Sequence, residues 1–139
     1  MFFSGSFGKT LELITREMDV AALRQNVIAN NIANADTPNF KRSVVNFESQ
    51  LRRALDSQNA RPPFPQAITN PRHIPFDKPM DWMQVRPRRV LDYLTEAKNN
   101  GNNVDIEEEG TNSLTNQLLY TTLTQAISSQ IQGVNIVLR

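Results

Sequence analysis

Apolar residues recur at helical spacing in a segment near the start of the chain. The steps between them alternate between four and three residues, which is the heptad spacing of a helix that packs along a seam. The seam positions are Phe7, Leu11, Ile14, Met18, Ala21, Ile28 and Ile32, with Gln25 as a polar interruption. Pro38 disfavours helical geometry at Thr37, and Asn34 and Asp36 suit a helix end. This spacing predicts a helix over residues 6–35.

A second segment with the same spacing lies near the end of the chain. Its seam positions are Tyr120, Leu123, Ile127, Gln130, Val134 and Val137. Asp105 followed by Glu108 resembles an acidic capping box, and further glutamates at 107 and 109 favour the positive end of a helix dipole. Gly110 costs about 1 kcal/mol relative to alanine inside a helix, so a kink or a later start is compatible with the sequence. We expect a helix over residues 105–138.

The stretch between the two helices, residues 36–104, has a different composition. Seven of the eight prolines fall between Pro62 and Pro87, and proline at this density excludes long helices and central strands. We therefore expect a largely irregular middle, in which runs such as residues 43–47 are suited to a short β-hairpin. The predicted fold class is mainly α: a single domain over residues 1–139, whose two long terminal helices form a coiled-coil-like pair around a Pro-rich middle.

The second predicted helix has no charged side chain between Gly110 and Leu138. The face opposite its seam carries Asn, Gln, Ser and Thr, and the end of the first helix is similar, with Asn26, Asn30, Asn31 and Asn34. A solvent-facing helix normally carries Lys and Glu, whereas an unpaired buried charge costs far more than a hydrogen-bonded amide. We therefore expect both helices to be enclosed by helices of other copies or partners. The alternative is a soluble helical hairpin with an exposed Gln/Asn-rich face, an adaptor or chaperone-like protein that binds one partner helix.

Charge and composition limit the other classes of function. The net charge is +1 over 139 residues, so the whole chain has no electrostatic attraction toward nucleic acid or an anionic membrane. There is no cysteine for disulfides or thiolate metal sites, and no stretch approaches the roughly 20 apolar residues of a membrane span. The first residues lack the basic and apolar regions of a Sec signal peptide, so a role outside the cytoplasm requires another export route.

Charge is also segregated along the chain. Residues 52–89 carry eight basic and three acidic side chains, whereas residues 92–109 carry six acidic side chains and one lysine. Segments of opposite charge can attract one another within a molecule or between neighbours.

We find no pattern of residues that indicates catalysis or a cofactor. His73 is the single histidine, and a lone histidine without cysteine makes neither a standard zinc site nor a recognisable triad. The glutamates at 107–109 occupy consecutive helical positions that diverge by about 100° each, which favours a capped helix start over a set of metal ligands. The best nucleic-acid candidate is the basic run Arg86, Arg88 and Arg89 near Trp82, but the low net charge argues against it. We predict no catalytic, metal or cofactor-binding residue and no nucleic-acid partner.

Three motifs resemble the flagellar basal-body rod proteins. Residues 29–42, ANNIANADTPNFKR, resemble the N-terminal signature of flagellar rod and hook proteins, an Asn-Asn-hydrophobic-Ala-Asn core followed by a turn and an aromatic residue. Residues 102–109, NNVDIEEE, resemble the turn that opens the C-terminal helix of proximal rod subunits, and residues 72–74, RHI, resemble a central motif of the same subunits. Residues 110–113, GTNS, depart from the strongly helical residues more common in relatives, which puts the start of the second helix in doubt.

The resemblance implies a structural, non-enzymatic subunit of the proximal rod. Such subunits self-assemble with other rod proteins into the helical shaft that spans the periplasm, transmits torque and is needed for motility. They contact ring or adaptor proteins of the basal body, and they are exported unfolded by the flagellar type III apparatus without a cleaved signal peptide. Phe7 and Leu11 match a pattern proposed for recognition by the export gate, although both also lie on the helix seam.

The predicted assembly interface follows the two seams and the asparagine group. It comprises Leu11, Ile14, Met18, Ile28, Asn30, Asn31, Ile32, Asn34, Leu119, Leu123, Ile127, Val134 and Val137. We expect the apolar members to pack within and between subunits. The three asparagines would fix lateral register through hydrogen bonds, as a buried polar residue does in coiled coils.

Overall fold

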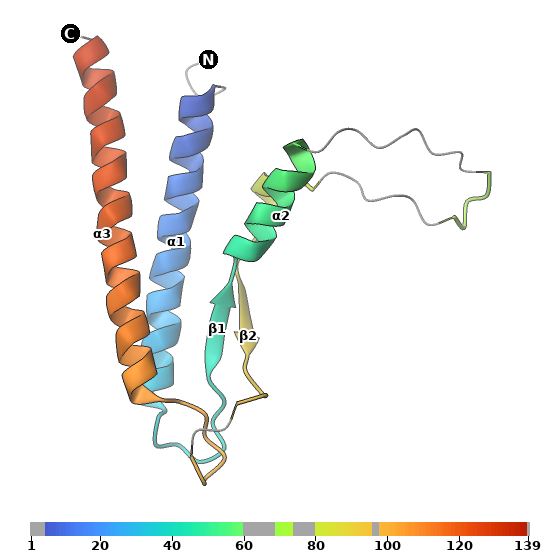
Figure 1. The fold of residues 1–139 in the computed structure, drawn as a ribbon, viewed down its shortest axis with the longest axis vertical. Coiled ribbons are helices and arrows are strands. Elements are labelled where there is room, and N and C mark those ends of the chain that lie inside the picture. Colours follow the sequence, from blue (N-terminus) through green and yellow to red (C-terminus); the bar gives the residue numbers. More distant parts are fainter. Residues whose placement is uncertain (1–4, 60–68, 74–79, 96–97, 139) are drawn as a thin grey trace. The chain divides into compact units, whose positions relative to one another are not determined.

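The computed structural model describes residues 5–59, 69–73, 80–95 and 98–138 of the chain. Its elements are α1 (Ser6–Ala33), β1 (Ser43–Asn46), α2 (Glu48–Asn59), the 3-10 turn η1 (Trp82–Gln84), β2 (Arg88–Leu91) and α3 (Ile106–Val137) (Figure 1). They form two compact units, one of residues Met1–Val45 with Arg89–Arg139 and one of residues Asn46–Arg88. The mainly helical class with two long terminal helices is confirmed.

The ends of the long helices follow local chemistry. α1 ends at Ala33, two residues before the predicted end. α3 begins directly after Asp105, whose carboxylate accepts hydrogen bonds from the backbone N–H groups of Glu107 at 2.9 Å and Glu108 at 3.4 Å. The helix continues without interruption through Gly110, so the later start considered from the sequence is wrong. The aspartate cap and the acidic first turn both stabilise this helix start.

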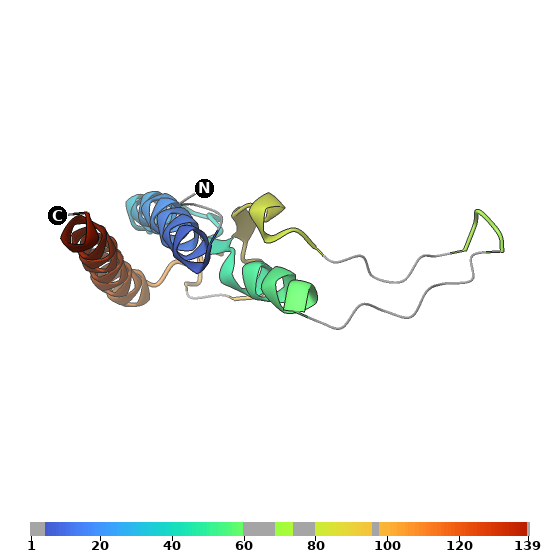
Figure 2. The same cartoon turned by 90° about the horizontal axis from the view of Figure 1, so that it is seen from above.

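α1 and α3 lie side by side and antiparallel (Figures 1 and 2). Two hydrogen bonds from the Asn116 amide cross between them, to the Ala21 carbonyl at 2.9 Å and to the Gln25 side chain at 3.0 Å. Gln25, the polar interruption of the first seam, also donates to the Ser113 hydroxyl at 2.9 Å. The distal part of α3 differs, because each described residue from Ser128 to Leu138 is exposed in the single chain. Coiled-coil-like pairing stays a prediction.

β1 and β2 form a two-stranded antiparallel sheet. The N–H of Asp92 donates to the carbonyl of Arg42 at 2.9 Å, which sets a register in which Val44 lies opposite Val90. The strand at residues 43–46 confirms the β-forming character of that run. However, the expected short β-hairpin is wrong in its connection, because residues 47–87 separate the two strands. A β-favouring run identifies a strand but not its partner when the partner is distant in sequence.

The second unit contains a helix that the sequence analysis did not predict. α2 follows apolar positions Phe47, Leu51, Ala54 and Leu55, a helical spacing too short to stand out beside the long seams. α2 contacts η1, and Phe47, Ala54, Trp82 and Val85 are buried in this unit. The prolines at 62, 63, 65, 75 and 79 lie outside the described residues, so the irregular Pro-rich stretch stays a prediction.

Candidate functional site: a polar junction between the two long helices

Buried polar side chains gather where the end of α1 meets the start of α3. Asn31, Asn102, Asn103 and Glu109 are each no more than 2% exposed, and Arg42 reaches the same place from just before β1. We call these five residues the polar junction. Buried polar groups in native proteins are almost always hydrogen-bonded, so each side chain must have a partner that explains its burial.

Asn102 holds the turn that follows α1. Its side-chain amide Nδ2 donates to the carbonyls of Asn34 at 2.9 Å, Ala35 at 3.0 Å and Thr37 at 2.8 Å, while its Oδ1 accepts from the N–H of Val104 at 2.7 Å. A helix end leaves several backbone carbonyls without partners inside the helix, and the turn after it adds more. A single asparagine in the segment before α3 therefore provides hydrogen bonds to the backbone carbonyls of the turn that follows α1.

Two further side chains act on the same turn. The Nζ of Lys98 donates to the Ala35 carbonyl at 2.8 Å and contacts the Asp36 carboxylate at 3.2 Å. Asn34 donates its own amide to the carbonyl of Asn30 at 2.8 Å, in the last turn of the helix. Side chains from the end of α1 and from the segment before α3 therefore both stabilise this turn.

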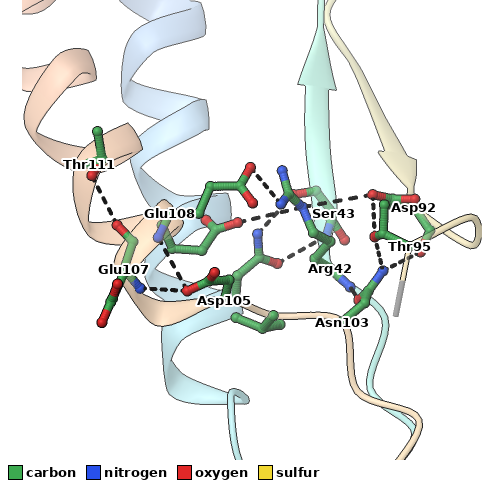
Figure 3. A network of polar contacts seen from close by, with 12 residues as sticks. Arg42, Ser43, Asp92, Thr95, Asn103, Asp105, Glu107, Glu108 and Thr111 are labelled. Atoms are coloured by element: carbon green, nitrogen blue, oxygen red, sulfur yellow. Dashed lines mark hydrogen bonds and ion pairs between the residues drawn. The ribbon is translucent and has the colours of Figure 1, made fainter. Parts of the chain in front are cut away.

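Asn103 links three segments (Figure 3). Its Oδ1 accepts from the N–H of Arg42 at 2.6 Å, and its Nδ2 donates to the carbonyl of Asp92 at 2.7 Å and to the Thr95 hydroxyl at 3.1 Å. The start of β1 and the end of β2 are therefore both tied to the entrance of α3.

Arg42 is surrounded by three carboxylates. Its Nη1 lies 2.8 Å from Glu108, and its Nε lies 3.7 Å from Glu109 and 4.0 Å from Asp92. Burial by itself would lower the pKa of Arg42, but the hydrogen bond and the charge of Glu108, aided by the other two acids, raise it. The guanidinium therefore stays charged and links α3 to both strands.

The two flanking acids respond to their surroundings in opposite ways. Burial raises the pKa of Glu109, although a hydrogen bond from Asn31 and the charge of Arg42 both oppose that rise. Hydrogen bonds from the Thr95 side chain and the Leu94 backbone lower the pKa of Asp92. Glu109 is thus the acid for which ionisation is least favourable.

The structure spreads the predicted interface residues over three environments. Ile28 and Asn31 are buried within their unit. The half-buried members are Leu11, Ile14, Met18, Asn34, Leu119, Leu123 and Ile127. The exposed members are Asn30, Ile32, Val134 and Val137. Phe7, of the proposed export pattern, is half-buried in the first turn of α1. The interface assignment stays a prediction.

The junction itself was not predicted, although the sequence carried a signal for it. In the sequence, Arg42 and Asn103 stand out only as parts of motifs, and Glu109 only as a charge that favours a helix start. The two motifs quoted above, residues 29–42 and 102–109, are the two segments that meet here. Amide and charged side chains concentrated in two separate motifs are consistent with a buried network that joins them.

The polar junction is suited to a structural role. Within the described residues, no group of three or more His, Asp or Glu side chains is placed to hold a metal ion. The described helices likewise include none with an apolar stretch sufficient to cross a bilayer. The side chains of the junction bond mainly to backbone and to one another, which fixes the geometry of the helix pair.

Comparison with known sequences assigns the chain that carries this polar junction to a class of protein. The sequence profile described as "Flagella basal body rod protein" matches residues 18–41, which cover the second half of α1 and the turn as far as Lys41. The matched segment therefore contains Asn31 and the turn held by Asn102. The class that the profile defines is the flagellar basal body rod proteins.

Full-length relatives narrow the assignment. A flagellar basal body rod protein FlgB from Borrelia hermsii is 43% identical, over 96% of this chain and 98% of the relative. FlgB from Borreliella burgdorferi is 38% identical over the same shares, and FlgB from Bacillus subtilis is 32% identical over 95% of each chain. The chain belongs to the FlgB family of flagellar basal body rod proteins. It is a structural subunit of the rod and not an enzyme.

Proposed function

We propose that this subunit occupies the proximal rod and assembles with further copies and other rod proteins into the helical shaft that spans the periplasm and transmits torque. The observation that carries the proposal is the surface of α3. From Gly110 to Val137 the helix has no charge, and Leu114 and Leu118 remain 59% and 60% exposed beside α1. Large apolar side chains on an uncharged exposed helix are typical of a surface that other proteins cover.

The threonines of α3 support this interpretation. Thr111, Thr115 and Thr122 each donate their hydroxyl to the backbone carbonyl four residues earlier, at 3.0, 2.9 and 2.8 Å. A hydroxyl that bonds its own helix leaves no donor unsatisfied when another helix packs over it. The threonine positions can therefore be buried against a neighbour at low cost in desolvation.

A groove between the two long helices offers a place for such a neighbour. It has a volume of about 390 Å³ and an uncharged lining that includes Ala21, Ala22, Asn26, Gln117 and Tyr120. Small side chains such as those of the two alanines let a third helix approach closely. The groove supports the predicted enclosure of α1 and α3 by helices of neighbouring subunits.

The proposed route and partners follow from the family. Export would proceed through the flagellar type III apparatus without a cleaved signal peptide, with Phe7 and Leu11 recognised while the chain is unfolded. Ring or adaptor proteins of the basal body would be neighbours of the assembled subunit. Motility would depend on the assembled rod.

Replacing Leu118 by aspartate in the source bacterium tests the proposal. The exposed position should tolerate the charge in the free subunit, whereas leaving it buried and unpaired in the rod costs about 3–5 kcal/mol per copy. We expect loss of motility and of completed basal bodies, with export of the subunit retained. Gln58→Asp places the same charge on the exposed face of α2 and should leave motility and the number of completed basal bodies unchanged. Full motility with Leu118→Asp would favour the adaptor alternative, which needs only one partner helix and predicts a stable monomer.

A further inference from the structure

The segment before α3 contains the single Asn-Gly pair of the chain, Asn100 followed by Gly101. The pair lies in a turn, and the side chain of Asn100 is exposed. Asparagine is a chemically labile residue, and it loses its amide most readily before glycine, because no Cβ hinders the approach of the glycine nitrogen to the asparagine side chain. The exposed pair is therefore a candidate site of chemical modification.

The fold uses both residues of the pair. Gly101 has a φ of +76°, and a Cβ at this position would lie 2.7 Å from Oδ1 of Asn39. Oδ1 of Asn100 accepts a hydrogen bond from the N–H of Asn102 at 3.1 Å, as asparagine commonly does with the backbone two residues on. Asn102 in turn bonds to the carbonyls of the turn after α1. The labile pair is thus part of the support of the polar junction.

Hydrogen bonds hold the pair in place in the folded chain. The N–H of Gly101 donates to the carbonyl of Lys98 at 3.1 Å, and the carbonyl of Asn100 accepts from the N–H of Asn39 at 3.0 Å. The bond from the N–H of Asn102 fixes the side chain of Asn100. Loss of the amide requires the Gly101 nitrogen to give up its proton and to reach Cγ of Asn100, so its own bond and the bond to the side chain must break. The reaction therefore needs the turn to open, and its rate follows the fraction of chains in which the turn is open.

We propose that Asn100 is a deamidation site that the folded turn protects and that an open or unfolded chain exposes. In the open chain, the deprotonated backbone nitrogen of Gly101 attacks Cγ of Asn100 and forms the C–N bond of a cyclic succinimide. The side-chain nitrogen takes up a proton and leaves as ammonia. Water then opens the ring: cleavage of the new C–N bond gives aspartate, and cleavage of the original peptide bond gives isoaspartate.

The two products differ in their effect on the polar junction. Aspartate keeps the path of the backbone and the oxygen that accepts from Asn102. Isoaspartate adds a carbon atom to the backbone and converts the carbonyl that accepts from Asn39 into a charged carboxylate off the main chain. The added atom displaces Asn102 from the three carbonyls that it contacts at 2.8–3.0 Å. A chain with isoaspartate at position 100 therefore forms a weakened junction.

Ageing of the purified full-length chain in buffer and in urea, at the same mildly alkaline pH, tests the proposal. Peptide mass spectrometry locates each amide that has become a carboxyl, and an isoaspartyl methyltransferase labels the isoaspartate. In urea, Asn100 should react faster than any other asparagine. In buffer it should react at least about tenfold more slowly, the factor that an opening cost of one net hydrogen bond provides. A faster reaction at another asparagine in urea, or equal rates at Asn100 in buffer and urea, would overturn the proposal.

Variants separate the chemistry from the protection by the fold. Asn102→Asp removes the amide that holds the turn after α1, so Asn100 should react in buffer nearly as fast as in urea, whereas the exposed Asn30→Asp should keep the wild-type rate. In urea, Gly101→Ala should slow the reaction, because a Cβ hinders the attacking nitrogen. A wild-type rate for Asn102→Asp in buffer, or for Gly101→Ala in urea, would contradict protection by the turn or the succinimide route, respectively.

The effect of the product on the junction is measured on the same samples. After ageing in urea and refolding, chains with isoaspartate at position 100 should unfold at a lower urea concentration than unmodified chains. Asn100→Asp, which has the same charge and an unaltered backbone, should unfold close to the wild-type midpoint. A wild-type midpoint for the isoaspartate chains would overturn the proposed damage to the polar junction.

Discussion

The side chain of Asn31 bonds to the backbone of Ser43 in both directions. Its Nδ2 donates to the Ser43 carbonyl at 2.9 Å, and its Oδ1 accepts from the Ser43 N–H at 3.0 Å. Both residues are 1% exposed. A planar amide presents one donor and one acceptor as a neighbouring strand would, so Asn31 substitutes for a strand partner on the helix side of β1. This pair fixes the strand to α1.

Asn31→Asp should therefore destabilise the folded chain strongly. The substitution keeps the shape of the side chain but removes the donor, and it places a second carboxylate beside Glu109, to which Asn31 also donates. Loss of the bond and the added buried charge should together lower the free energy of unfolding by about 3 kcal/mol or more. Urea unfolding followed by circular dichroism measures this change. Asn30→Asp is the control: it is exposed and 3.3 Å from Arg89, so a near-wild-type midpoint is expected. Equal effects of the two substitutions would contradict the assignment.

Asn102→Asp should have an effect of similar size at the other end of the junction. The amide that serves three carbonyls would become a carboxylate facing the same three acceptors, a repulsion that cannot be relieved at a site with 0% exposure. We expect the unfolding free energy to fall by about 3 kcal/mol. Asn100→Asp retains the oxygen that accepts from the Asn102 N–H and is exposed, so its midpoint should shift little. A stable Asn102→Asp variant would show that the turn after α1 is held by other contacts.

Two glycine-to-alanine substitutions should change stability in opposite directions. Gly101 has a φ of +76°, and a Cβ there would lie 2.7 Å from Oδ1 of Asn39, so alanine should lower the unfolding free energy by about 1–2 kcal/mol. Gly110 lies inside α3 with nothing within 4 Å of an added Cβ, so alanine should raise the free energy by about 1 kcal/mol. Thermal unfolding of the two variants side by side would reveal the opposite signs. Stabilisation by alanine at position 101 would rule out the turn geometry.

The junction acids should make stability depend on pH in two opposite ways. The pKa of Glu109 is raised above its ordinary value of 4.5, so its stabilising contribution is complete below that pH and is lost as the pH rises through the raised pKa. The pKa of Asp92 is lowered from 3.8, so its contribution is present above that pH and is lost as the pH falls through the lowered pKa. Wild-type stability relative to Glu109→Gln should therefore decline from pH 4 to pH 7.

Urea midpoints across this range, extended into acid below pH 3.8 for Asp92, provide the measurement. Asp92→Asn serves as the internal control because its trend is reversed: its deficit relative to wild type should be largest near neutral pH and shrink in acid. Parallel curves for the wild type and Glu109→Gln would show that burial does not govern the titration of Glu109.

The long helices could be predicted because their signals are local. The apolar seam and the Asp105 cap each lie within a few residues, and α3 begins directly after Asp105 as the sequence indicated. The partner of β1 and the contacts of Arg42 could not be predicted, because they join residues about 50 or more positions apart. Gln25 shows the same limit: it interrupts a sequence pattern, and only its distant partners Ser113 and Asn116 explain why a polar residue belongs there.

The antiparallel register of β1 and β2 has a consequence for how variable this protein can be. Asn46 and Arg88 lie at the same end of the sheet, and residues 46–88 form a compact unit of their own between them. The chain thus leaves the unit that contains α1 and α3 and returns to it at the same end of the sheet. We call residues 46–88 the excursion; insertions, deletions and substitutions within it should leave Asn31, Arg42 and Asn102 in place. The fold is in this sense modular: natural variants and engineered insertions should concentrate in the excursion, while the polar junction tolerates few changes.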